Sequence, residues 1–200
     1  LNQGVAETVS NVETFLKDNG KTLGWAAGLV VVIVLAVFAY TNWVMAPARE
    51  KAKGEAFAAE AYFQKGDYET ALSGDGNCLG LADVIDQYGS KAGKGIYFEA
   101  GACQLQLKNY TEALNYFKKY KGSDKLLKAR SLCCIGDCYA GLDDLAQALA
   151  SYKAAASASD NILAAGYLLK AGITAEALGL PEEALGYYKS IKNKYPASVE

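Results

Sequence analysis

The sequence predicts an all-α protein, in which a single transmembrane helix near the N-terminus is followed by an α-solenoid of about four helix pairs. Two observations support this fold class. Between Lys21 and Arg49 the chain carries no charged residue, which is typical of a membrane span. From Ala52 onward, small and aromatic residues recur together every 35 or 36 residues, and such periods are typical of stacked helix pairs.

The composition excludes several classes of function. The 200 residues include no His, which removes Ser-His-Asp and Cys-His catalysis and zinc sites that need imidazole. A net charge of −2 argues against nucleic acid, whose binding proteins usually carry a basic stripe. No phosphate-binding glycine loop or Gly-x-Ser-x-Gly elbow is present. We therefore expect a protein that is not an enzyme and that has no catalytic residue, cofactor, metal or small-molecule substrate.

Residues 1–21 are predicted to form an amphipathic segment. Its apolar residues follow one another at spacings of four, three and four residues: Val5, Val9, Val12 and Leu16. Gly20, directly after Asn19, is expected to end this helix. The segment lies on the membrane surface or against a partner, or it is a partly ordered tail.

Residues 22–48 are predicted to form the transmembrane helix. At ~1.5 Å per residue the uncharged run rises about 36 Å, which exceeds the ~30 Å hydrocarbon core. Trp25 near one end and Tyr40 and Trp43 near the other match the aromatic belts that anchor a span at its two interfaces.

A cleaved signal peptide is the alternative to this anchor, because Ala46-Pro47-Ala48 resembles a cleavage site. The apolar run is much longer than the ~7–15 residues of signal peptides, which favours an uncleaved anchor. Lysine and arginine residues flank the span on both sides, so the charge count does not decide its orientation.

Residues 49–200 are predicted to form the solenoid, with repeats near 52–93, 94–128, 129–164 and 165–200. In three segments a Gly is followed twelve residues later by Ala and then, four residues on, by an aromatic residue: Gly101, Ala113 and Phe117; Gly136, Ala148 and Tyr152; Gly172, Ala184 and Tyr188. These residues match the tetratricopeptide pattern, in which small residues allow two antiparallel helices to cross closely. An earlier copy contains Gly66-Asp67-Tyr68 and Ala71.

The first repeat is longer than the others, and residues 73–77 are predicted to form a loop before a helix resumes at residues 81–85. Asp75-Gly76-Asn77 lacks the remaining ligands of a calcium loop. Five cysteines follow no Cys-x-x-Cys spacing, and four of them are expected to be small buried residues: Cys103, Cys133, Cys134 and Cys138.

A protein-binding groove is expected on the first helices of the repeats, which line the concave side of such a solenoid. Aligning the repeats gives these candidate groove residues: Glu60, Phe63, Phe98, Leu105, Arg130, Asp137, Leu169, Ile173 and Glu176. Their mixed character predicts a groove for an apolar helix or an extended chain. The alternative is that several of them are ordinary packing between helices.

The stretch Val12-Glu13-Thr14-Phe15-Leu16-Lys17-Asp18-Asn19-Gly20-Lys21, leading into one span and then tetratricopeptide repeats, resembles the YfgM-like family of ancillary SecYEG translocon subunits. The similarity is clearest at Asn19-Gly20-Lys21 and at Gly66-Asp67-Tyr68. The resemblance implies a single-pass protein of the bacterial inner membrane with the solenoid in the periplasm. It also implies SecYEG and a PpiD-type membrane-anchored chaperone as partners, but it assigns no groove residue.

The leading hypothesis from the sequence is therefore a non-catalytic, membrane-anchored scaffold of the Sec translocon that binds a periplasmic chaperone or translocating chains. One alternative is an adaptor in another envelope assembly, for cell division or outer-membrane biogenesis. Another is a receptor that faces the cytoplasm and binds a soluble partner.

Overall fold

The computed structural model describes residues 2–158 and 161–199. All regular elements within these residues are helical, which confirms the all-α prediction. The chain divides into two units, Leu1–Ala48 and Arg49–Glu200, which are described separately.

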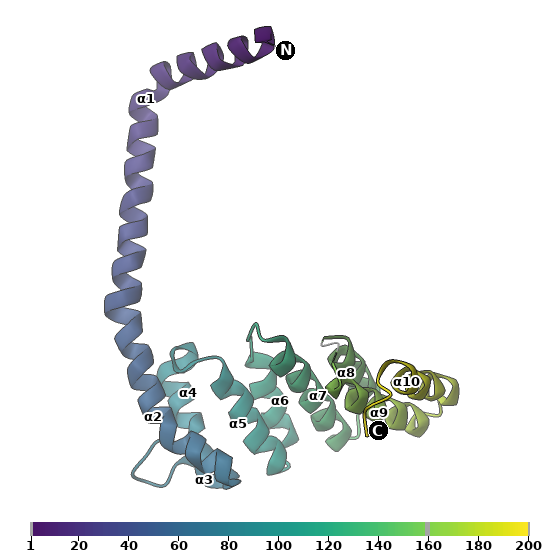
Figure 1. The fold of residues 1–200 in the computed structure, drawn as a ribbon. Helices are drawn as coiled ribbons and strands as arrows, with labels where there is room; N and C mark the ends of the chain where they lie inside the picture. The colour runs from purple at the N-terminus through teal and green to yellow at the C-terminus, as the bar shows by residue number, and fades with distance from the viewer. Residues whose placement is uncertain (1, 159–160, 200) are drawn as a thin grey trace. The chain divides into compact units, whose positions relative to one another are not determined.

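The first unit is built from one long helix, α1 (Asn2–Ala39), which continues into a π-helix, η1 (Tyr40–Met45). The expected helix end at Gly20 is wrong, because α1 runs through this residue without a break. Figure 1 shows that α1 is instead bent in its purple part. The Asn19 side-chain amide donates to the Phe15 carbonyl oxygen at 3.1 Å, and such competition for a helical carbonyl bends a helix.

The apolar side chains of α1 and η1 are uncovered within the structure. The large apolar residues from Leu29 to Phe38 are all more than half exposed, and Trp25 and Trp43 are 82% and 80% exposed. In the described part of the chain this is the one helix that is long and apolar enough to cross a membrane. A contiguous apolar surface of this size requires a cover such as lipid or a partner protein.

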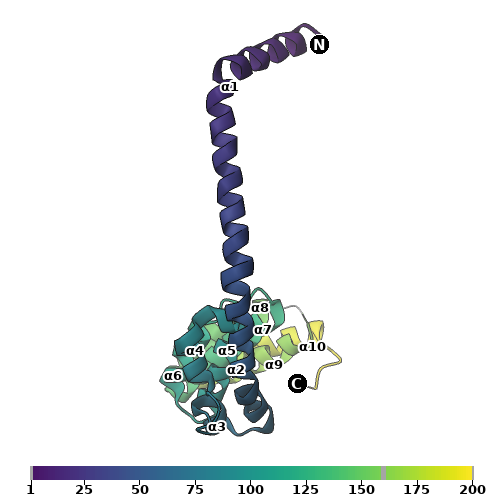
Figure 2. The ribbon, with the colours of Figure 1, turned by 90° about the vertical axis from the view of Figure 1, so that its left-hand side faces the viewer.

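The second unit is a stack of helix pairs in chain order (Figure 1), and Figure 2 looks along the stack. Its helices are α2 (Ala46–Lys65), α3 (Tyr68–Ser73), α4 (Leu81–Tyr88), η2 (Gly89–Ala92), α5 (Gly95–Gln106), α6 (Tyr110–Lys119), α7 (Lys125–Gly141), α8 (Leu145–Ala158), α9 (Leu163–Ala177) and α10 (Pro181–Lys194). Three regular pairs, α5/α6, α7/α8 and α9/α10, follow the irregular first pair.

The two helices of each regular pair cross where a glycine meets an aromatic ring. An added Cβ would lie 2.9 Å from the Phe117 ring at Gly101, 2.5 Å from the Tyr152 ring at Gly136 and 2.3 Å from the Tyr188 ring at Gly172. These six residues are the ones that recur in the sequence pattern. The small residue is therefore required for the crossing, and the predicted repeat geometry is confirmed at these positions.

The turns within the pairs share one backbone conformation. The φ angle is +81° at Gly66, +61° at Lys108, +62° at Asp143 and +73° at Gly179, which lie at the equivalent position of successive repeats. In each turn the next N–H bonds to the carbonyl oxygen five residues earlier, as Asn109 does to Gln104 at 2.8 Å. The left-handed conformation is free of strain for Gly but costs other residues about 1–2 kcal/mol.

The second helix of the first repeat is interrupted, as predicted, by a loop between α3 and α4. Asp75 organises this loop, because its carboxylate accepts the backbone N–H groups of Asn77 and Cys78 and the hydroxyl of Tyr62. These hydrogen bonds lower the pKa of Asp75. The loop also needs Gly80, where a Cβ would lie 2.2 Å from the Leu72 carbonyl oxygen.

The core runs continuously along the stack, because neighbouring pairs share apolar clusters. One cluster joins α2 to α5, another joins α5 to α7, and a third joins α7 to α10. Cys103, Cys133 and Cys138 are buried and Cys134 is half-buried, in agreement with their predicted packing role. Burial raises the pKa of the Cys103, Cys134 and Cys138 thiols to about 12, so these thiols are protonated and unreactive.

Candidate protein-binding groove

The first helices of the three regular pairs, α5, α7 and α9, border a cavity of about 550 Å³. Three of the residues that sequence alignment placed in the groove line it together: Leu105, Arg130 and Asp137. Leu105 comes from α5, and Arg130 and Asp137 come from one face of α7, since seven residues make about two turns. The structure therefore brings these three predicted residues to a common surface.

Asp137 is the centre of a hydrogen-bonded network within this cavity. Its Oδ1 accepts the Tyr152 hydroxyl at 2.7 Å, and its two carboxylate oxygens accept Lys170 Nζ at 2.7 and 2.8 Å. The Lys170 ammonium also lies 5.7 Å from the centre of the Tyr152 ring. Asp137 on α7 thus fixes the position of α9 through Lys170 and that of α8 through Tyr152.

The charge states in this network follow from its contacts. Burial lowers the pKa of Lys170, but the hydrogen bond to Asp137 and the surrounding negative groups outweigh burial, so the pKa is raised overall. Burial and then the hydrogen bond to Asp137 raise the pKa of Tyr152. Lys170 therefore remains an ammonium and Tyr152 a neutral donor, so the Asp137 charge is compensated. Arg130 forms no ion pair with the described residues and is the cation that this cavity offers to a partner.

Phe98 lies below this surface. It is 8% exposed, and its ring packs 5.6 Å from that of Phe117 and 6.2 Å from that of Tyr120. The Arg130 guanidinium lies 5.9 Å from the centre of the Phe98 ring. Phe98 is thus a packing residue that supports Arg130 through a cation–π contact, which agrees with the packing alternative for this position.

The other predicted residues lie on first helices but outside the lining of this cavity. Glu60 and Phe63 are half-buried on α2, and the Phe63 ring packs on Tyr68 at 6.0 Å. On α9, Leu169 is half-buried, while Ile173 is 55% exposed and Glu176 is exposed. The structure therefore does not bring these five residues to the cavity that Leu105, Arg130 and Asp137 line.

Glu99 on α5 was missed by the sequence reasoning. Its Oε2 atom is buried and, among the described residues, has no hydrogen-bond partner. Burial, and then the nearby charge of Glu60, raise the pKa of Glu99 to about 7. Glu60 and Glu99 occupy the repeat positions that Asp137 and Lys170 occupy two repeats later, so the same contact is acidic at one end of the groove and an ion pair at the other.

Seven further residues of the cavity were also missed as groove residues: Gln106, Cys133, Cys134, Leu163, Gly166, Tyr167 and Lys170. The two cysteines were assigned to packing, and burial raises the pKa of Cys133 to about 11. Lys170 carried a usable signal, because it lies 33 residues after Asp137, three fewer than the repeat spacing of 36. That offset places the two side chains one helical turn apart on neighbouring first helices.

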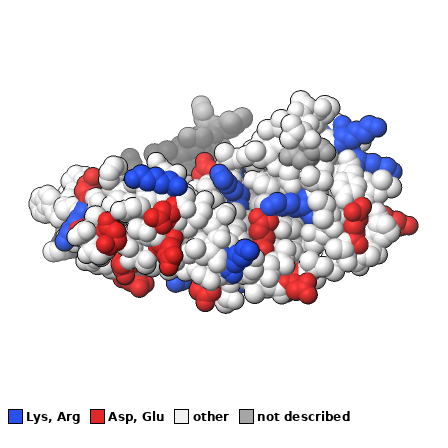
Figure 3. Space-filling view, turned by 90° about the horizontal axis from the view of Figure 1, so that it is seen from below, with Lys and Arg blue, Asp and Glu red and all other residues white. Residues whose placement is uncertain are grey.

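The surface charge of the solenoid is mixed. Figure 3 shows basic and acidic side chains interspersed on the face seen from below, without a large area of one sign. An ion pair between Lys153 Nζ and Glu183 Oε1 at 2.9 Å also joins α8 to α10, and both side chains are partly exposed. The visible face thus lacks the basic stripe that nucleic acid would require.

Comparison with known proteins identifies the repeat type. Residues 167–198, which cover most of α9 and all of α10, match the tetratricopeptide repeat family. No curated protein sequence is significantly similar to the chain. The match covers the segment that contains Gly172, Ala184 and Tyr188 and agrees with the repeat predicted there.

Solved structures of MamA share the fold. The "MamA RS-1 ArsTM double mutant" is 16% identical over 82% of both chains, with a TM-score of 0.62. "MamA 41-end from Desulfovibrio magneticus RS-1" is 16% identical over 74% of this chain and 78% of that one, with a TM-score of 0.60. A further crystal structure of MamA is 16% identical over 72% and 78%, with a TM-score of 0.61. This chain has a tetratricopeptide-like fold, which is typical of protein-interaction scaffolds.

Proposed function

We propose that this chain is a membrane-anchored, non-catalytic scaffold whose groove binds a protein partner. The observation that carries the proposal is the cavity of about 550 Å³ between α5, α7 and α9. Leu105 offers an apolar contact there, Arg130 offers a free cation, and the Asp137–Lys170 pair holds the helices in register. An extended segment or a helix of a partner fits such a surface.

The uncovered helix α1 supports the anchoring part of the proposal. In a bilayer its exposed apolar side chains are covered by lipid, and Trp25, Tyr40 and Trp43 lie at the interfaces. The anchor confines the solenoid to the membrane surface. The effective concentration of the groove near other membrane proteins is thereby raised without any additional contact.

The resemblance to the YfgM-like family supports a narrower form of the proposal. In this form the chain is an ancillary subunit of the Sec translocon in the bacterial inner membrane, and its solenoid lies in the periplasm. The partners are SecYEG and a PpiD-type chaperone or the chains that emerge from the translocon. Asn19-Gly20-Lys21 and Gly66-Asp67-Tyr68 are the residues that support this narrower form.

Groove variants of the full chain test the binding surface. Leu105→Ser should weaken binding to the purified PpiD-type chaperone about tenfold or more, because a leucine that the partner buries contributes ~1.5–3 kcal/mol. Arg130→Glu should weaken binding by a similar factor, because it reverses the charge that the groove offers to the partner. Leu126→Ser and Lys125→Glu are matched controls, since both residues are exposed on α7 outside the cavity. If controls and groove variants bind alike, the groove is not the binding surface.

Two further experiments separate the narrower proposal from its alternatives. A reporter that is active only in the periplasm, fused after Glu200, should be active, and an inactive fusion would favour a cytoplasm-facing receptor. Crosslinkers placed beside Trp25 and Trp43 should capture the SecYEG channel. Their failure to do so, with an active reporter, would favour an adaptor in another envelope assembly.

A further inference from the structure

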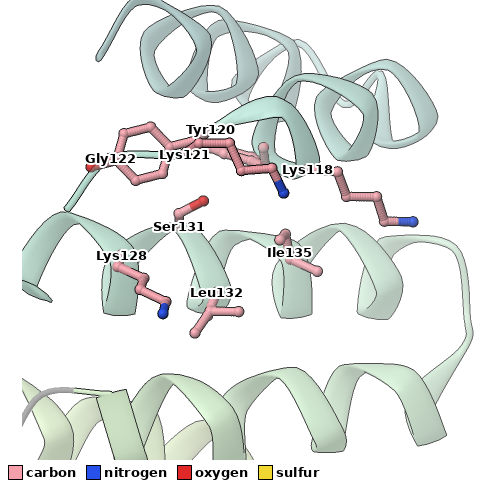
Figure 4. A pocket seen from close by; sticks show the side chains of 9 residues that line it. Lys118, Tyr120, Lys121, Gly122, Lys128, Ser131, Leu132 and Ile135 are labelled. Atoms are coloured by element: carbon pink, nitrogen blue, oxygen red, sulfur yellow. The ribbon is translucent and has the colours of Figure 1, made fainter. Parts of the chain in front are cut away.

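A second cavity, of about 450 Å³, lies between α7 and the end of α6 with the segment that follows it (Figure 4). Its α7 residues, Lys128, Ser131 and Ile135, lie on the face opposite to Arg130 and Asp137, since the two sets are about half a helical turn apart. The cavity is therefore separate from the protein-binding groove, and no part of the proposed function uses it.

The cavity is lined by cations. Lys118, Lys121 and Lys128 are among its lining residues, and no acidic residue is among the described residues that line it. The Lys118 ammonium lies 5.4 Å from the centre of the Tyr139 ring and points away from the cavity, so Lys121 and Lys128 are the cations available to a ligand (Figure 4). Residues 118–128 contain five Lys and one Asp, a net charge of +4 in a chain whose net charge is −2. The one acid, Asp124, accepts the Leu127 backbone N–H at 2.6 Å and is thus used as the N-cap of α7.

Ser131 supplies a polar group inside this cavity. The residue is 4% exposed, and its side chain points across the cavity toward Tyr120 and Lys121 (Figure 4). Four other helical serines donate their side-chain hydroxyl to the backbone carbonyl oxygen four residues earlier: Ser73, Ser151, Ser157 and Ser190. The Ser131 hydroxyl makes no such bond within the described chain, and its oxygen is not among the fully buried unpaired atoms, so it is free to donate to a ligand or to water in the cavity.

The apolar part of the lining limits the ligand further. Leu132 and Ile135 on α7 and Phe117 on α6 form the remaining wall. A cavity of about 450 Å³ also exceeds the space that an isolated phosphate or a few waters would fill. The occupant that fits this wall has an anionic group at the lysines and an organic part against the apolar side chains.

We propose that this cavity binds the phosphate group of an organic phosphate ester, with Ser131 and the surrounding lysines as hydrogen-bond donors. Lysine is a common phosphate ligand, and two ammonium groups favour a phosphate over a singly charged anion. The phosphate ester is a soluble small molecule or a phospholipid headgroup. These two sources share the same chemistry at the lysines and differ in the group that contacts Leu132 and Ile135.

Lysine footprinting on the full chain in an uncharged detergent tests the proposal. Acetylation of Lys121 and Lys128 is followed by mass spectrometry during titration with glycerol phosphate and, separately, with short-chain phosphatidylglycerol. Short-chain phosphatidylcholine is the control lipid, and Lys125 is the internal control because it lies on α7 outside the lining. Protection of Lys121 and Lys128, but not of Lys125, by either phosphate probe supports the site and identifies the source of the phosphate.

Two matched double variants show whether the site or the general charge is responsible. Lys121→Gln/Lys128→Gln should weaken binding about tenfold, whereas Lys119→Gln/Lys125→Gln, which removes the same charge from the same segment, should change it less than about twofold. Ser131→Ala should weaken binding severalfold and leave the circular dichroism unchanged. Equal losses in both doubles, protection by phosphatidylcholine, or no protection by either phosphate probe would overturn the proposal.

Discussion

Replacing Gly136 with Ala tests the helix crossing on which the repeats depend. An added Cβ would lie 2.5 and 2.6 Å from two atoms of the Tyr152 ring, whereas ordinary contacts begin at 3.4 Å. The ring would therefore have to move by about 1 Å. It is 4% exposed, and its hydroxyl is held by Asp137 at 2.7 Å, so there is no free space into which it can move.

The expected loss of stability is the sum of two destabilising effects and one stabilising effect. Overpacking a core costs about 1–3 kcal/mol, and weakening the hydrogen bond from Tyr152 to the Asp137 carboxylate adds about 1 kcal/mol. Replacing Gly with Ala within a helix stabilises the helix by about 1 kcal/mol. Gly136→Ala should thus lower the free energy of unfolding by about 1–3 kcal/mol.

Gly186→Ala is the matched control, because Gly186 is also helical and an added Cβ would have no neighbour within 4 Å. It should raise the free energy of unfolding by about 0.5–1 kcal/mol. The assay is urea denaturation of the full chain in a mild detergent, followed by far-ultraviolet circular dichroism. Equal stability of the two variants would refute the crossing geometry.

Three further substitutions probe other parts of the solenoid by the same assay. Burial raises the pKa of Glu99 to about 7, so the folded protein holds a proton that the unfolded chain loses near its ordinary pKa. The full shift corresponds to about 3 kcal/mol, which partial exposure reduces to about 2 kcal/mol, and stability should fall by this amount as the pH rises from about 4.5 to above 7. Glu99→Gln should abolish this dependence. Lys108→Gly should stabilise the protein by about 1 kcal/mol because φ is +61° at this position. Lys170→Met should cost about 1 kcal/mol, since it leaves the partly buried Asp137 carboxylate with Tyr152 as its remaining donor.

Each of these expectations has a contradicting result. If Glu99→Gln retained the pH dependence of the wild-type protein, that dependence would belong to another ionisable group. Lys189→Gly, within α10 and exposed, should destabilise the protein, and an equal loss of stability in Lys108→Gly would contradict the strain expected at Lys108. For Lys170→Met, a double-mutant cycle with Asp137→Asn should give a coupling of about 1 kcal/mol, and additive effects would mean that the ion pair is not stabilising.

The repeat pattern predicted the helix pairs well because it is local and recurs. Gly136 and Tyr152 mark the same contact as Gly172 and Tyr188, so each copy supports the interpretation of the others. The left-handed turn position could be recognised at Gly66, but the residue type of Lys108 does not indicate it; the position is marked by the backbone hydrogen bond from Asn109 to Gln104 that closes the turn.

Only part of the candidate groove was predicted, because helical spacing indicates on which face of a helix a residue lies but not how deeply its side chain is buried. Leu105 and Arg130 line the cavity, whereas Phe98, seven residues before Leu105 on the same face of α5, is buried and contacts Arg130 from below. The pairing of Asp137 with Lys170 depends on the offset between neighbouring helices, which the sequence does not state directly. Gly20 resembled a helix end, but α1 continues through it, and the contact of the Asn19 side chain with the Phe15 carbonyl oxygen accompanies a bend and not an end.

Site-specific photocrosslinking in living cells tests the central claim, that the groove is the surface by which this scaffold binds a protein. A photoreactive residue at Leu105 should give a discrete crosslinked partner, and Arg130→Glu in the same chain should abolish that product. A photoreactive residue at Leu185, which is exposed on α10 outside the cavity, should give none. Equal products from Leu105 and Leu185, or a Leu105 product that persists with Arg130→Glu, would contradict the claim.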